Sequence, residues 1–440
     1  MKRLQFGIIV QIFMVRSYSE ILERIERGEA VVMTSQEVCE LVEKGEKARL
    51  EDVDVVTTAT RAVMSGTYAV FSFSVASPGT FLRAKKVWIN GIAAQVGPCP
   101  NENLGVLDLV VYGTAHSRDR PGYGGGHLFR DLAKRKPAQV EVETDDGRSL
   151  QAEVGLDEMP FARLFGSRHA FKNYSAFVNP GEKPVFTIFH AREFEPCCRG
   201  ATFSGCGQIN PVKNDPLLET IGIGTRILLN GSEGFVIGTG TRSCPERPNL
   251  AGFADMHSME PEYMGGFLTS GGPECICSWA VPIPVISETI LREIARLDKQ
   301  ISLPVMDVNT RTVMGQADYG DVWEGVDLEV EFDPEKCRGC ARCLVEEVCP
   351  MIAVHFDGRA ASRDDERCFH CGLCTTECPS EAFRCNLGSI RLKTADGATN
   401  TIPVVLRQSD KLRALKVALD LKRRVLDGSF KMAEPVEKIS

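Results

Sequence analysis

The residues best suited to chemistry are eight cysteines that form two runs towards the C-terminal end of the sequence. The first run is Cys337, Cys340, Cys343 and Cys349, and the second is Cys368, Cys371, Cys374 and Cys378. The second run has two, two and three residues between its cysteines, a spacing typical of bacterial iron–sulfur proteins, whereas the first has two extra residues before its last cysteine. Three close thiolates bind three corners of a cubane cluster, so a fourth ligand must come from elsewhere.

We expect the fourth ligands to cross between the two runs, as they do in two-cluster ferredoxins. One cluster then takes Cys337, Cys340, Cys343 and Cys378, and the other takes Cys368, Cys371, Cys374 and Cys349. The alternative is a zinc site or a group of unmetallated thiols, but two triplets and two single cysteines fit the paired ligands of zinc poorly. The stretch resembles the dicluster ferredoxin family over about 55 residues, which implies two 4Fe-4S clusters that move single electrons.

Subtracting these eight from the 17 cysteines leaves nine. They are Cys39, Cys99, Cys197, Cys198, Cys206, Cys244, Cys275, Cys277 and Cys385. We expect Cys39 and Cys385 to be small core hydrophobes. Glycines flank Cys197, Cys198 and Cys206, and Arg199 is expected to lower the pKa of a neighbouring thiol and to help bind an anion. In a strand, the sulfurs of Cys275 and Cys277 would point the same way.

Three interpretations of these spare cysteines stay open. Cys197, Cys198, Cys206, Cys275 and Cys277 could include a nucleophilic or persulfide-carrying thiol. They could bind a further metal, because soft thiolates attract zinc and iron. They could also be buried structural cysteines.

A glycine-rich turn and a polar stretch could position an anionic substrate. Gly124, Gly125 and Gly126 precede a predicted helix over 128–134, so free backbone amides are expected at its N-terminus. His127 is either a general acid or a structural cap. The residues after the apolar strand 53–56, Thr57 to Arg61, predict a polar turn at a strand end, and Arg61 is a second candidate for binding an anion.

The elements that must position these residues indicate an α+β protein, because regular strand–helix alternation is missing. We expect helices over 17–27, 161–174 and 411–426, the last capped by Ser409, and further helices begun by a capping box at Thr34 and Glu37 and by Ser287. Hairpins are predicted at Asn90–Gly91, at residues 145–148 and at Asn230–Gly231. The expected domains are a hairpin-rich mixed α+β domain over 14–300, a connector over 301–331, a two-cluster ferredoxin-like domain over 332–388, and a strand pair with a C-terminal helix over 389–440.

Composition narrows the class of partners. The chain of 440 residues has a net charge of −8 and no long basic run, which makes nucleic acid an unsuitable partner. The apolar run over 6–15 is too short to cross a bilayer. Thiolate-bound clusters need a reducing compartment, so a cytoplasmic protein is expected. A homo-oligomer is also expected.

Residues 14–300 resemble the homocysteine-biosynthesis, sulfur-incorporating family. The matching stretches are 27–32, 53–58, 86–90, 123–127, 214–216, 221–225 and 282–284. The resemblance implies conversion of aspartate semialdehyde and sulfide-derived sulfur to homocysteine, with electrons from a ferredoxin-like partner. Two family cysteines are replaced, by Ser65 and by Asp146. Because serine cannot carry a persulfide, the sulfur-carrying role would move to the spare cysteines.

The fused form, in which the family domain and a ferredoxin share one chain, resembles the methanogenesis-marker branch of this family. That resemblance implies a short anionic aldehyde, sulfoacetaldehyde, converted to coenzyme M with sulfide or a persulfide as sulfur donor. A partner protein is the potential electron donor. The alternatives are the homocysteine reaction itself, and an electron- or sulfur-transfer module that serves a partner protein.

Overall fold

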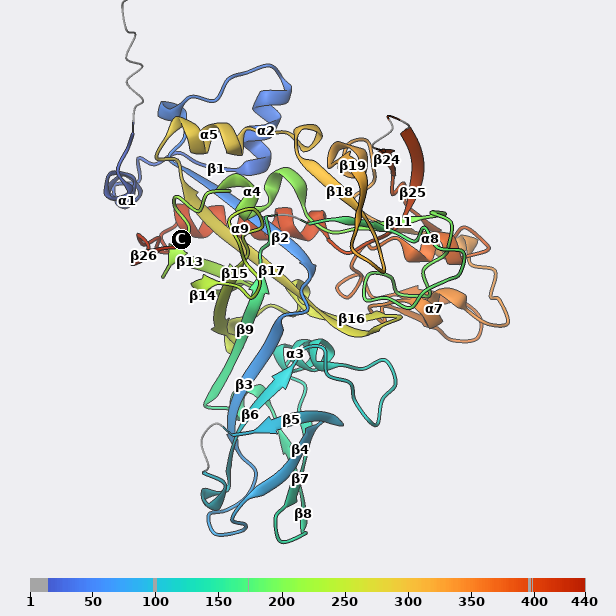
Figure 1. Cartoon of the computed structure of the whole chain (residues 1–440). Coiled ribbons are helices and arrows are strands. Elements are labelled where there is room, and N and C mark those ends of the chain that lie inside the picture. Colours follow the sequence, from blue (N-terminus) through green and yellow to red (C-terminus); the bar gives the residue numbers. More distant parts are fainter. Residues whose placement is uncertain (1–14, 98–100, 173, 395–396, 398, 440) are drawn as a thin grey trace, which may run out of the picture.

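The computed structural model describes residues 15–97, 101–172, 174–394, 397 and 399–439. Most of the apolar run over 6–15, and Cys99, therefore lie outside the described residues. The described chain is a mixed α+β protein in which a large sheet, a small barrel and a cysteine-rich lobe pack together (Figure 1). Among the described residues, no helix is long and apolar enough to cross a membrane.

A 14-stranded sheet forms the body of the protein. In spatial order its strands are β1 (Val32–Thr34), β2 (Val55–Val63), β17 (Gly272–Pro284), β13 (Arg226–Leu229), β14 (Ser232–Thr239), β15 (Leu250–Asp255), β9 (Phe161–His169), β3 (Thr67–Ser74), β6 (Val106–Tyr112), β5 (Ile92–Val96), β4 (Ala84–Ile89), β7 (Ala138–Thr144) and β8 (Ser149–Val154), with β16 (Gly265–Thr269) beside β17. The long antiparallel pair of β2 and β17 lies at the centre of the molecule (Figure 1).

A closed six-stranded barrel lies beside this sheet. Its strands are β10 (Ala176–Val178), β11 (Ala201–Phe203), β25 (Thr399–Arg407), β24 (Ser389–Lys393), β19 (Val313–Asp318) and β18 (Ser302–Asp307). The stretch 301–331, expected to be a connector, thus contributes β18 and β19 to the same barrel as the predicted C-terminal strand pair. The barrel joins segments from the middle and the end of the chain into one folding unit.

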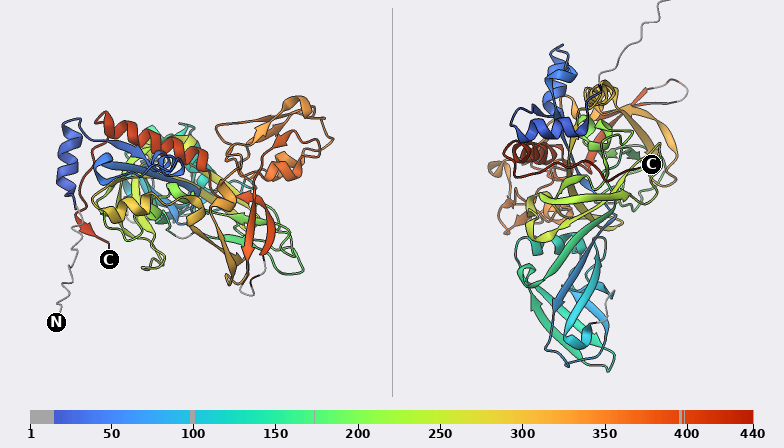
Figure 2. Two further views of the ribbon diagram at one scale, coloured as in Figure 1. Left: turned by 90° about the horizontal axis from the view of Figure 1, so that it is seen from above. Right: turned by 90° about the vertical axis from the view of Figure 1, so that its left-hand side faces the viewer.

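The cysteine-rich lobe, residues 331–384, is inserted between β19 and β24 of this barrel. It contains β20 (Glu331–Phe332), α7 (Leu344–Val348), β21 (Val354–Phe356), β22 (Ala361–Arg363), α8 (Leu373–Glu377) and β23 (Phe383–Arg384). Figure 2 shows the lobe projecting from one end of the body, with α9 (Lys411–Leu426) crossing the sheet beside it. A 16-residue helix therefore spans from the body towards the lobe.

The remaining helices are α1 (Tyr18–Glu26), α2 (Ser35–Glu43), α3 (Gly125–Ala133), α4 (Pro211–Asn214), α5 (Glu288–Ile294) and α6 (Gly320–Trp323), and a strand pair, β12 (Gly222–Ile223) with β26 (Glu437–Lys438), holds the C-terminal segment. The capping box at Thr34 and Glu37, the cap at Ser287 and the three predicted hairpins are confirmed. These signals are local, so tertiary packing does not override them.

Three local predictions are wrong. Residues 161–169 form β9 instead of a helix, because Ala162, Leu164 and Gly166 alternate into the sheet with strand period. Residues 57–61 are not a polar turn, since β2 runs through them to Val63. The cap of α9 is Asp410, whose side chain accepts from the backbone of Arg413, while Ser409 accepts the Gly205 N–H instead.

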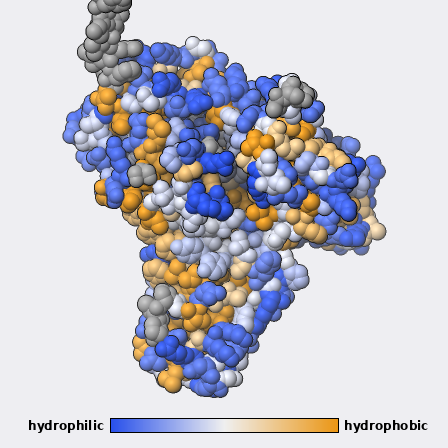
Figure 3. Space-filling view, viewed as in Figure 1, coloured by the Kyte–Doolittle hydropathy of each residue, from blue (hydrophilic) through white to orange (hydrophobic). Residues whose placement is uncertain are grey.

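Aromatic side chains cross five adjacent strands in register. Tyr112, Tyr68, Phe165, Phe253 and Phe235 are direct cross-strand neighbours, and their ring centroids lie 5.3 to 6.4 Å apart. Such pairs stabilise one register over its alternatives. Figure 3 shows that hydrophobic residues also reach the surface of the lower lobe built on β3 to β9.

Candidate iron–sulfur and thiol site

Two cavities inside the cysteine-rich lobe are each lined by four cysteines. One cavity is lined by Cys349, Cys368, Cys371 and Cys374, and the other by Cys337, Cys340, Cys343 and Cys378. Each run thus sends its last cysteine to the cavity of the other run. We call these the inner and the outer cavity. The inner one is named for its position against the large sheet.

The donors around these cavities fit iron–sulfur clusters. The backbone amide of Ala353 donates to the Cys349 sulfur, and that of Ala361 donates to the Cys337 sulfur, both at 3.3 Å. Backbone N–H groups directed at ligand sulfurs are one of the features by which proteins tune such clusters. Among the described residues, no group of three or more His, Cys, Asp and Glu side chains converges as ligands of a single metal ion do; the thiols surround the cavities instead.

The inner cavity lies against the central strands. Pro350 O accepts a hydrogen bond from the Leu268 amide of β16 at 2.8 Å, and Cys371 O accepts one from the Arg407 amide of β25 at 2.9 Å. Ile276 of β17 belongs to one apolar cluster with Phe369 and Leu373, which line the inner cavity. The lobe is therefore docked through both backbone hydrogen bonds and buried apolar contacts.

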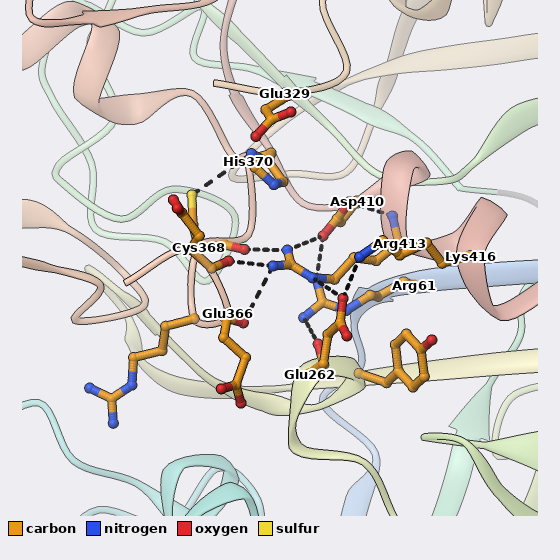
Figure 4. A network of polar contacts seen from close by, with 12 residues as sticks. Arg61, Glu262, Glu329, Glu366, Cys368, His370, Asp410, Arg413 and Lys416 are labelled. Atoms are coloured by element: carbon orange, nitrogen blue, oxygen red, sulfur yellow. Dashed lines mark hydrogen bonds and ion pairs between the residues drawn. The ribbon is translucent and has the colours of Figure 1, made fainter. Parts of the chain in front are cut away.

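A buried ion network joins the lobe to β2 and α9 (Figure 4). The Arg61 guanidinium lies 2.6 Å from the Asp410 carboxylate, and Asp410 also pairs with Arg413 at 3.1 Å. Arg413 donates to backbone oxygens of the lobe, including that of Cys368. Arg61 packs 4.8 Å from the centre of the Phe369 ring. Because the Arg61 charge is already paired and only 1% exposed, our prediction that it binds an anionic substrate loses its basis.

Cys275 and Cys277 lie on β17 and are fully buried. Both belong to the core of the large sheet, whereas Ile276 between them packs towards the lobe, so the two sulfurs point to one face as strand alternation requires. Their hydrogen bond and burial raise the pKa of Cys275. Burial opposes ionisation of Cys277 as well, but hydrogen bonds from Cys275, Thr67 and Asn230 outweigh it and lower the pKa of Cys277.

The other candidate thiols, Cys197, Cys198 and Cys206, lie before and after β11 and not on β17. Cys206 is fully buried, with its sulfur 3.7 Å from the backbone oxygen of Arg61, and burial raises its pKa to about 11. Cys197 is exposed and Cys198 half-buried, both in left-handed backbone conformations before β11. Our prediction that Arg199 lowers the pKa of a neighbouring thiol is wrong for Cys198, because burial raises the pKa of that thiol and the Arg199 side chain is 70% exposed near Glu195.

The remaining spare cysteines among the described residues are Cys39, Cys385 and Cys244. Cys39 is a core residue as predicted, with its sulfur 3.6 Å from the Ile294 oxygen, and burial raises its pKa to about 12. Cys385 is only partly buried, 3.6 Å from the Asp327 oxygen, and Cys244 is exposed. Asp146 lies in the exposed turn between β7 and β8.

The glycine turn before α3 does not offer free amides. The Gly124 amide donates to His127 Nδ1 at 3.1 Å, and the amides of Gly125 and Gly126 donate to backbone oxygens of residues 115 and 113 at 3.0 Å. Our prediction of an anion site at Gly124, Gly125 and Gly126 is therefore wrong. His127 acts as a cap, and burial, followed by the charge of Arg367, lowers its pKa to about 4, so at neutral pH it is the uncharged imidazole and not the imidazolium that a general acid requires.

We expect Gly125→Ala to destabilise the protein by about 2 kcal/mol or more, because its added methyl would lie 2.1 Å from the Tyr112 oxygen. Gly155→Ala is the matched control, since its methyl would meet nothing closer than 3.5 Å. Thermal midpoints of the two variants measure the difference. Equal midpoints would show that the turn is not packed as described.

Glu274 is a buried acid that the sequence analysis missed. It precedes Cys275, hydrogen-bonds the exposed Ser65, and its Oε2 has no partner. The backbone of Met64, next to Ser65, donates to the Cys275 oxygen at 2.7 Å. The exposed Ser65 thus adjoins the strand that carries the buried thiol pair. The only signal of Glu274 in the sequence was its place between Gly271–Gly272 and Cys275.

Burial raises the pKa of Glu274 from 4.5 to about 7. The folded state therefore keeps a proton that the unfolded chain loses above pH 4.5, and this stabilisation declines as pH rises through about 7, by about 3 kcal/mol in all. Glu274→Gln should lose less stability than the wild type between pH 6 and pH 8. Parallel decline of both thermal midpoints would contradict this.

The described chain combines a cysteine-rich lobe that contains two cysteine-lined cavities with a buried pair of thiols in the large sheet. The sequence profile described as "homocysteine biosynthesis enzyme, sulfur-incorporation" matches residues 30–432. The chain belongs to this family. The match encloses the cysteine-rich lobe, in agreement with the barrel that spans it.

Relatives agree with this membership. A protein of Methanothermobacter thermautotrophicus described as uncharacterised is 47% identical over 95% of this chain and 94% of its own length. An L-aspartate semialdehyde sulfurtransferase of Methanosarcina acetivorans is 30% identical over 72% of this chain and 65% of its own length. An uncharacterised ferredoxin of Methanocaldococcus jannaschii is 35% identical over 60 residues, 13% of this chain and 75% of that protein. No solved structure matches.

Proposed function

We propose that this protein is a reductive sulfurtransferase that converts a short anionic aldehyde into a thiol. The balanced reaction is R–CHO + HS⁻ + 2 e⁻ + 3 H⁺ → R–CH2–SH + water. If a persulfide supplies the sulfur, two further electrons reduce that sulfur atom. The observation that carries the proposal is the position of β17: its thiol pair faces the sheet core while Ile276 between them packs on residues lining the inner cavity.

Two 4Fe-4S clusters would supply the electrons singly, held by the four cysteines of the inner cavity and the four of the outer cavity. The chain's own residues enclose the thiol pair and hold the lobe in place. The thiol pair is shielded from water, which protects bound sulfur from loss to solvent. Leu268, Arg407 and Arg413 hold the lobe against the strands that carry the thiols.

Aspartate semialdehyde is the first candidate substrate, because the sulfurtransferase relative is named for it. Sulfoacetaldehyde, which would give coenzyme M, is the second. It is favoured by one observation: Ser65 stands where the resemblance implies a sulfur-carrying cysteine, so this chain departs from homocysteine-forming members at the thiol site. Arg61, paired with Asp410, favours neither.

The test feeds each aldehyde with sulfide to the anaerobic, reduced full-length protein and measures the thiol formed by mass spectrometry. Thiol from one aldehyde supports the proposal and identifies the substrate. If neither aldehyde yields thiol while the protein still reduces an added redox protein, the chain is instead an electron- or sulfur-transfer module.

A further inference from the structure

We infer that Cys277 is the thiol that carries the transferred sulfur. Thr67, His169 and Asn230 position the Cys277 Sγ atom for that transfer. The inference rests on the proposed function and deepens it, since it selects one thiol among the spare cysteines. Thr67 of β3 and Asn230 of the β13–β14 hairpin lie next to the Cys277 sulfur, and His169 of β9 contacts Thr67.

Two side chains lie within hydrogen-bonding distance of the Cys277 sulfur. Thr67 Oγ1 lies 3.5 Å from it, and Asn230 Nδ2 lies 3.8 Å from it. The orientation of Asn230 is fixed, because its Oδ1 accepts the Ser278 amide at 2.8 Å, which leaves the N–H groups of Nδ2 to face the sulfur. A donor fixed in this way stabilises the thiolate, the form that attacks sulfur.

The proton on His169 is fixed by its neighbours. The Trp279 indole N–H can only donate, and it donates to His169 Nδ1 at 2.8 Å. His169 therefore carries its hydrogen on Nε2 and donates it to Thr67 Oγ1, also at 2.8 Å. The Thr67 hydroxyl then has one hydrogen to give, either to the Met64 oxygen at 2.7 Å or to the Cys277 sulfur. When Cys277 ionises, Thr67 can therefore donate its hydroxyl hydrogen to the sulfur by rotating the O–H bond, while its oxygen stays in place.

Burial keeps His169 neutral, because it lowers the pKa of His169 to about 3. For Cys277, burial opposes ionisation, but the contacts with Cys275, Thr67 and Asn230 lower its pKa, whereas the contact between the two thiols and burial raise the pKa of Cys275, so Cys277 is the more readily ionised thiol of the pair. Sulfur loading from a persulfide donor is then Cys277–S⁻ + R–S–SH → Cys277–S–SH + R–S⁻. One S–S bond breaks, one forms, and no net electrons are needed.

Both sulfurs are enclosed in this conformation, so loading is best followed as a time course. Full-length protein with its clusters is treated with glutathione persulfide under anaerobic conditions, and the peptide containing residues 275 and 277 is analysed by mass spectrometry. We expect one added sulfur atom on the wild type and on Cys275→Ser, and none on Cys277→Ser. Loading of Cys277→Ser, or of neither thiol in the wild type, would overturn the inference.

The positioning residues are tested by the pH profile of loading. Thr67→Val removes the hydroxyl donor with little change of shape and should move the profile to higher pH, whereas Thr67→Ser should restore it. Thr58→Val is the matched control, because Thr58 is equally buried but bonds only the Val281 oxygen at 2.8 Å. Equal profiles for Thr67→Val and Thr58→Val would reject the role of Thr67.

The aldehyde assay, repeated with glutathione persulfide as the sulfur donor in place of sulfide, separates this inference from the function it rests on. Sulfur bound on Cys277 with no thiol product from any aldehyde would refute the proposed function alone. Thiol product formed by Cys277→Ser would refute the inference and leave the function standing.

Discussion

Replacing Asp410 with alanine is expected to destabilise the protein by about 3–5 kcal/mol, because it leaves Arg61 buried without its counter-charge. The same change removes the N-cap of α9, which costs about 1 kcal/mol more. Among the described residues, the Arg61 side chain then keeps the Glu262 backbone oxygen and the face of Phe369 as partners. Since Arg413 also loses a partner, the lobe should loosen from the body before the sheet unfolds.

Thermal midpoints and limited proteolysis of the cluster-loaded protein measure this effect. Asp427→Ala is the matched control at the other end of the same helix, because the pair of Asp427 with Arg423 is solvent-exposed and contributes little to stability. Early cleavage near residues 331–384 is expected for Asp410→Ala only. If the two variants behaved alike, the network would not be what holds the lobe in place.

Cys371→Ala is expected to abolish thiol formation and to remove about half of the bound iron, because it deletes one ligand of the inner cavity and spares the outer one. Loading of sulfur on the thiol pair should persist, since that step needs no electrons. Iron content, the electron paramagnetic resonance spectrum of the reduced protein and thiol product are the three measurements.

Cys385→Ala provides the control for this variant. Cys385 lies beside the lobe, 3.6 Å from the Asp327 oxygen, and lines neither cavity. It should retain all iron and full thiol formation. Undiminished product from Cys371→Ala would mean that electrons do not pass through the inner cavity.

Local signals in the sequence predicted local structure well. The Thr34–Glu37 capping box and the Asn90–Gly91 turn were confirmed because each is decided within four residues. The strand period also predicted that Cys275 and Cys277 point to one face. The Phe161 segment failed because its apolar residues suit either period, and only pairing with β3 and β15 decides between them.

Contacts distant in the sequence could not be predicted. Thr67 and His169 meet across 102 residues, and Arg61 meets Asp410 across 349. Each side chain alone is ordinary in the sequence, so nothing there marks Thr67 as the neighbour of a thiol. The anion site at Gly125 failed for a similar reason, because the partners of its amides come from a turn that the pattern did not place.

The lobe enters and leaves through β19 and β24, two antiparallel-sheet neighbours in one barrel, so both of its ends are anchored at the same place. A separate ferredoxin reaches its enzyme by collision, and its supply falls when either protein is diluted. Here the stoichiometry is fixed by the gene, and the effective molarity of the donor stays constant at any dilution. Electron delivery from the lobe to the thiol centre should therefore be unimolecular.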